Sequence, residues 1–62
     1  MNIYEVGGIK YKATNEYKAV KEAYKLADVW NMLSYNKNEK SWIYEAVFSS
    51  GKVKLKVLKL TN

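Results

Sequence analysis

Residues 14–33, TNEYKAVKEAYKLADVWNML, are the stretch of the chain with sustained helical periodicity. Apolar side chains recur there at intervals of three and four residues, at Val20, Ala23, Ala27 and Trp30. Lysines and carboxylates occupy the opposite side of the same helical wheel. The pattern predicts an amphipathic helix over residues 14–33 that buries one face against a sheet.

The start of this helix is marked by residues that favour a first turn. Thr14 or Asn15 can cap it with a side-chain oxygen, and Glu16 places a carboxylate at the positive end of the helix dipole. The end is predicted near Ser34, because Asn36 follows and asparagine accepts the left-handed conformation that closes many helices.

A β-hairpin is predicted before the helix, with Ile3–Val6 and Ile9–Lys12 as strands. Gly7-Gly8 between them can adopt the positive φ angles of a two-residue type I′ turn. If Val6 lies opposite Ile9, the side chains divide between two faces. The expected core face carries Tyr4, Val6, Ile9 and Tyr11, and the other face carries Ile3, Glu5, Lys10 and Lys12.

A second hairpin is predicted after the helix, from Trp42–Phe48 and Lys52–Leu60, which both alternate with period two. A loop of two residues, Ser50-Gly51, or of four would place the aromatic face of the first strand beside Val53, Leu55 and Val57. A loop of three would place it beside lysines instead. We favour the even-numbered loop, because it gives one continuous apolar face and pairs Glu45 with lysines.

These elements predict an α+β domain spanning residues 1–62, with order ββαββ and one helix across one face of a four-stranded sheet. A glycine-rich first hairpin, a central helix and a second hairpin beginning Trp42-Ile43-Tyr44 make this outline similar to the small β-grasp domains. The resemblance implies that the first and last strands lie side by side and parallel in the middle of the sheet. It is a resemblance of topology and implies no function.

Composition argues against several classes of function. The 62 residues include no cysteine and no histidine, which removes thiol nucleophiles, the usual general base and the common zinc ligands. The six carboxylates are not spaced to gather in one cleft. We therefore expect no catalytic residue, no metal site, no cofactor and no small-molecule substrate. The N-terminus does not resemble a signal peptide and no apolar run is long enough to span a bilayer, so a cytoplasmic location without membrane contact is expected.

The outer face of the sheet, turned away from the helix, is the candidate binding surface. It is predicted to combine an apolar centre with a lysine rim, the composition typical of protein interfaces. Its residues are Ile3, Ile43, Val47 and Leu58 at the centre and Lys10, Lys12, Lys54 and Lys56 at the rim.

Two functions fit this surface. The first is a small accessory or inhibitor protein, of the kind found in phages and mobile elements, that binds a protein partner or a second copy of itself. The alternative is nucleic-acid binding, since the net charge is +5 and all eleven basic residues are lysines, which could contact a row of phosphates. Lysine lacks the planar fork with which arginine reads bases, and lysine rows also protect exposed strands and helix faces.

Overall fold

The computed structural model describes residues 1–61, which fold into five strands and one helix. The elements are β1 (Asn2–Val6), β2 (Ile9–Ala13), α1 (Glu16–Ala23), β3 (Val29–Asn36), β4 (Ser41–Phe48) and β5 (Gly51–Lys59). The strands form one antiparallel sheet in the order β2-β1-β5-β4-β3. The α+β class with a single helix is confirmed, whereas the prediction of four strands is wrong.

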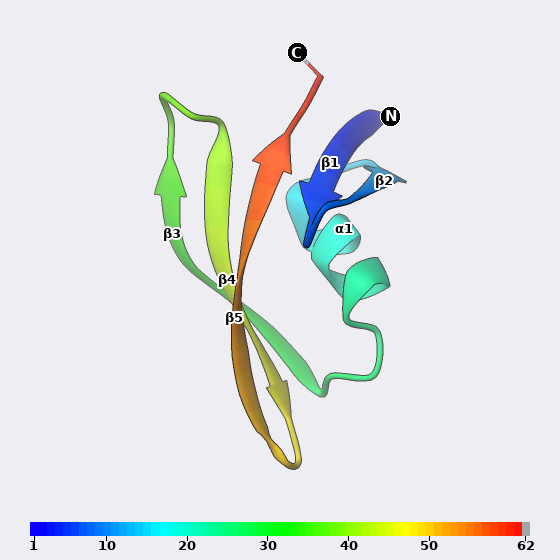
Figure 1. Ribbon diagram of the computed structural model, residues 1–62, viewed down its shortest axis with the longest axis vertical. Coiled ribbons are helices and arrows are strands. Elements are labelled where there is room, and N and C mark those ends of the chain that lie inside the picture. Colours follow the sequence, from blue (N-terminus) through cyan, green and yellow to red (C-terminus); the bar gives the residue numbers. More distant parts are fainter. Residues whose placement is uncertain (62) are drawn as a thin grey trace.

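The helix and the first hairpin are grouped at one end of the sheet (Figure 1). β3 forms the opposite edge, and the turn from β3 to β4 projects away from α1. The molecule is accordingly elongated, with extents of 35, 20 and 18 Å.

The first hairpin has the predicted register, with Val6 opposite Ile9. Gly7 and Gly8 have φ angles of 59° and 82°, as a type I′ turn requires. On the predicted core face, Tyr4 and Val6 are buried. Ile9, opposite Val6 on the edge strand β2, is 58% exposed and so does not belong to the core.

The helix begins where the sequence predicts and ends earlier. Asn15 is the cap, and its side-chain oxygen accepts a hydrogen bond of 2.9 Å from the backbone N–H of Lys18. Ala19 and Val20 are fully buried under this short helix. It ends at Ala23, so the predicted extension to residue 33 is wrong.

The remainder of the predicted helix is a turn followed by strand β3. Val29 and Trp30 are of types that favour strands, and β3 pairs with β4 along its whole length. The indole N–H of Trp30 donates to the backbone oxygen of Tyr24 at 2.9 Å, which satisfies a carbonyl just past the helix end. Ala27 and Trp30 thus contact the core from a turn and a strand, and their helical spacing is coincidental.

The extra strand also reverses the direction of β4 and β5 relative to β1, compared with the predicted fold. β1 and β5 are neighbours, as the β-grasp resemblance implies, but they run antiparallel, with Glu5 opposite Leu58 and Val6 opposite Val57. Each hairpin turn reverses the chain, so inserting β3 before β4 inverts the direction of β5 relative to β1. The β-grasp outline is therefore wrong in strand number and in strand direction.

The second predicted hairpin is the β4–β5 pair. Its loop is Ser49-Ser50, one residue earlier than the loop of the same length in the prediction. The shift preserves the faces, since Ala46 lies opposite Val53 and Tyr44 opposite Leu55. The continuous apolar inner face is therefore as expected.

The core lies between α1 and the inner face of the sheet. Its buried apolar residues are Tyr4, Val6, Ala13, Ala19, Val20, Ala27, Tyr44, Ala46, Leu55 and Val57. The hydroxyl of Tyr44 on β4 donates a hydrogen bond of 2.8 Å to the carboxylate of Glu16 on α1, which links the sheet to the helix. Burial raises the pKa of Tyr44, and the hydrogen bond to the Glu16 carboxylate raises it further.

This elevated pKa predicts that stability falls in alkaline solution. Above the ordinary tyrosine pKa of about 10, the unfolded chain releases the Tyr44 proton while the folded chain retains it, so rising pH favours unfolding. Tyr44→Phe removes both the hydrogen bond and the titration. At neutral pH we expect this variant to be less stable by about 1–2 kcal/mol. Denaturant titrations of both proteins from pH 7 to 11 give the difference in their free energies of unfolding. This difference should narrow above pH 10, and a constant difference would contradict a raised pKa of Tyr44.

Candidate protein-binding surface

The outer face of the sheet lies opposite α1 and alternates apolar residues with charged ones. Four cross-strand pairs of β4 and β5 lie on it: Ser41–Leu58, Ile43–Lys56, Glu45–Lys54 and Val47–Lys52. On β1 and β2, the pairs Ile3–Lys12 and Glu5–Lys10 lie on the same face. Strand alternation therefore places apolar, acidic and basic side chains next to one another across four strands.

The eight predicted contact residues fall into two groups on this face. One group comprises Ile43, Val47, Lys54 and Lys56 on β4 and β5, and the other comprises Ile3, Lys10 and Lys12 on β1 and β2. Leu58 lies between the groups, opposite Ser41 on β4 and Glu5 on β1. The structure thus brings them onto one face without gathering them around a single centre.

The lysines of this face are exposed, whereas its four predicted apolar residues are half-buried. Two apolar residues that sequence reasoning missed are more accessible. Val29, opposite Val47, is 44% exposed, and Leu60, whose N–H donates to the backbone oxygen of Ile3 at 2.8 Å, is 46% exposed. Val29 was missed because the helical period extended over it.

A depression of about 440 Å³ opens beside Ile3. It is lined by Ile3, Lys10, Tyr11, Lys12, Leu60 and Thr61. The hydroxyl of Thr61 accepts a hydrogen bond of 3.1 Å from the backbone N–H of Ile3, which holds the last described residues against β1. Three of the predicted contact residues therefore border one concave, partly apolar surface.

Two lysines of β5 on this face form ion pairs with carboxylates. Lys56 forms an ion pair with Glu39 at 3.1 Å, and Lys52 forms one with Glu45 at 3.4 Å. The hydrogen bond from Lys56, helped by another from the Ser41 hydroxyl, lowers the pKa of Glu39. The outer face therefore carries alternating charges and lacks the uniform positive potential typical of a phosphate-tracking groove.

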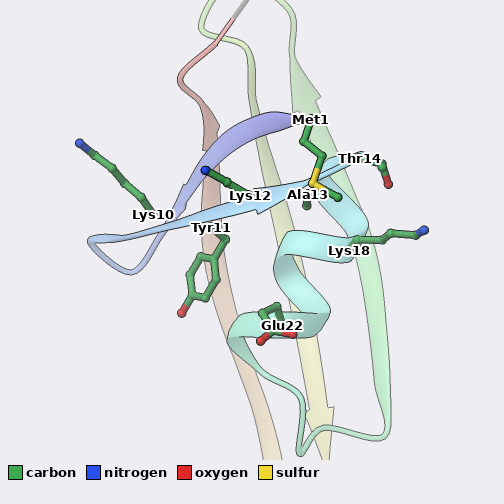
Figure 2. A pocket seen from close by; sticks show the side chains of 8 residues that line it. All are labelled: Met1, Lys10, Tyr11, Lys12, Ala13, Thr14, Lys18 and Glu22. Carbon is green, nitrogen blue, oxygen red and sulfur yellow. The ribbon is translucent and has the colours of Figure 1, made fainter.

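A second depression, of about 450 Å³, lies on the helix side of β2. It is lined by Met1, Lys10, Tyr11, Lys12, Ala13, Thr14, Lys18 and Glu22. Figure 2 shows Lys10 and Lys18 extending from opposite ends of it and away from each other, with the Glu22 carboxylate between the two ends. These cations do not converge on one point, so the depression lacks the geometry of an anion site.

The edge of the sheet formed by β3 is the second accessible apolar region. Four of its side chains are 44–55% exposed: Val29, Met32, Leu33 and Tyr35. The pairing with β4 shifts between Met32 and Ser34, so Leu33 is the extra residue of a β-bulge. The segment Val29–Asn36 contains no charged side chain. This edge strand was not predicted, although its valine, tryptophan and tyrosine are typical of strands.

Neither a metal-binding cluster nor a membrane-spanning helix is found in the part of the chain that the structure describes. Residues 1–61 contain no group of three acidic, histidine or cysteine side chains that could hold a metal ion. The one helix found among them is too short to cross a lipid bilayer.

Comparisons of this chain with protein-family models, with curated proteins and with solved structures found no match, so inference about its function rests on the surfaces described above.

Proposed function

We propose that this chain is a non-enzymatic binding protein, an accessory or inhibitor, that contacts another protein through the outer face of its sheet. The apolar part of the contact comprises Ile3, Ile43, Val47 and Leu58, which are spread over that face, and it is extended by Val29. The rim comprises Lys10, Lys12, Lys54 and Lys56. The observation that carries the proposal is the alternation of apolar and charged side chains on the face that α1 leaves open.

The mixed charge of this face favours a protein partner over nucleic acid. Lys52 and Lys56 have carboxylate partners, and Glu45 lies opposite Lys54. A phosphate backbone would have to approach these carboxylates, whereas a protein surface can match both signs and cover the apolar centre.

Val47→Lys tests the proposal, because it places a charge in the apolar part of the contact, next to Val29. Leu26→Lys is the matched control, since Leu26 is 87% exposed in the turn after α1 and the net charge changes equally. With wild type and both variants as bait in a lysate, we expect Val47→Lys to bind the captured protein at least about tenfold more weakly and Leu26→Lys to bind it as wild type does. Thermal melting of each bait checks that the fold is intact.

The nucleic-acid alternative is tested with the same proteins. Mobility shifts of a DNA duplex and a single strand are measured against salt, with Lys54→Glu added as a variant. Retardation that weakens with salt and is lost in Lys54→Glu, together with protein capture that Val47→Lys leaves unchanged, would replace the proposal with nucleic-acid binding.

A further inference from the structure

Strand β3 presents an unpaired backbone edge. It pairs with β4 along one side, and within residues 1–61 no strand pairs with its other side. Exposed edges of soluble proteins usually carry lysine or another device against pairing, and the other edge of this sheet, β2, carries Lys10 and Lys12. β3 has eight residues, exposed apolar side chains and no charge. Apart from its bulge, it lacks such protection.

We infer that β3 pairs antiparallel with β3 of a second copy of this chain, so that two sheets join edge to edge around a two-fold axis. The distribution of charge favours a second copy of this chain as the partner of β3. Each copy carries a net charge of +5, so two copies repel wherever lysines meet, and the uncharged β3 edge is where they can approach without opposed cations. A strand edge is also self-complementary, as a two-fold contact requires.

The bulge at Leu33 restricts the register of this pairing. Trp30, opposite Ala46, and Tyr35, opposite Trp42, lie on the inner face, whereas Asn31, opposite Glu45, and Ser34, opposite Ile43, lie on the outer face. Residues that oppose each other across an antiparallel pair share a face.

In one register, all of β3 is paired and opposing residues share a face. In that register, Asn31 lies opposite Ser34 of the second copy and Trp30 lies opposite its Tyr35. Met32 and Leu33 then flank the two-fold axis. One strand pair buries less than the roughly 1,600 Å² of a standard interface, so we expect a weak, concentration-dependent dimer. This seam is the backbone edge of the sheet and shares Val29 with the proposed contact surface, but the inference does not depend on the proposed function.

Cysteine cross-linking tests the register, and the absence of native cysteine makes the probes unique. Asn31→Cys and Ser34→Cys are made as separate proteins and oxidised mildly, alone and mixed. We expect a disulfide-linked heterodimer, identified by mass under non-reducing conditions, to form several-fold faster in the mixture than either homodimer. Equal cross-linking of each variant alone, or no cross-linking in the mixture, would overturn the inference.

Solution mass tests the dimer itself. Light scattering on wild type up to about 1 mM should show the mass rising from 7.2 kDa towards twice that value. Leu33→Lys places two lysines beside the axis and should weaken dimerisation by about tenfold or more, whereas Leu26→Lys, which adds the same charge in the turn after α1, should leave it unchanged. A wild type that stays monomeric throughout, or a Leu33→Lys variant that dimerises as well as Leu26→Lys, would overturn the inference.

Discussion

Replacing Tyr4 with alanine should lower the free energy of unfolding by about 4 kcal/mol, as expected for truncation of a buried aromatic side chain. Tyr4 is 3% exposed, and its ring packs edge-on against Trp42 at a centroid distance of 6.0 Å. It belongs to β1, which joins the first hairpin to the rest of the sheet. A domain of this size has a total stability of only about 3–9 kcal/mol, so a large fraction of the variant should be unfolded.

Tyr35→Ala is the matched control for that change. Tyr35 also packs on Trp42, at 4.9 Å, but it is 50% exposed on the edge strand. The same truncation there should cost about 1 kcal/mol or less. Urea unfolding of both variants gives the comparison, and equal losses would mean that burial of Tyr4 does not determine its contribution.

Replacing Trp30 with alanine should cost about 3 kcal/mol, although Trp30 is only half-buried. Its ring lies edge-on to Tyr17 at 6.4 Å, with the ammonium of Lys21 5.2 Å from its centroid. Its indole also donates to the backbone oxygen of Tyr24. The variant therefore loses an aromatic contact, a cation–π contact and the hydrogen bond that joins β3 to the end of α1.

Trp30→Phe divides this loss into two parts. Phenylalanine keeps most of the ring packing and lacks the indole N–H, so it should cost about 1–2 kcal/mol. Lys18→Ala, on the exposed side of the same helix, should remain within about 0.5 kcal/mol of wild type. A Trp30→Ala variant that melts close to wild type would show that β3 and α1 are not held together by this residue.

Local signals in the sequence predict the β1–β2 and β4–β5 hairpins well. Two adjacent glycines define the first turn, and alternation of Tyr4 and Val6 with their charged neighbours defines its faces. In the β4–β5 pair, charge complementarity selects the faces without fixing the loop, because moving a two-residue loop by one position preserves them. Asn15 and Glu16 locate the start of the helix for a similar reason, since capping is a contact over three residues.

Sequence reasoning missed strand β3, because it assigned the first part of that segment to the helix. Ala27 and Trp30 satisfy a helical period, and that period outweighed the strand propensity of Val29, Trp30 and Tyr35, which is a weak signal when it is taken alone. The segment becomes a strand because β4, which follows it after the four-residue turn 37–40, offers it a backbone edge. The accessible apolar residues of β3 were missed with it, whereas the eight outer-face residues follow from alternation alone.

The pairing of β1 with β5 has a consequence for synthesis. Glu5 lies opposite Leu58, so the strand that holds the first hairpin in the sheet is made about fifty residues later. Until β5 is made, Tyr4 and Val6 have a helix beside them, but the edge of β1 that later pairs with β5 has no partner strand. We therefore expect the β3–β4–β5 meander to assemble from contacts close in sequence, and the N-terminal half to dock last. Such long-range closure is typical of folding in milliseconds to seconds, which leaves the nascent chain time to meet chaperones.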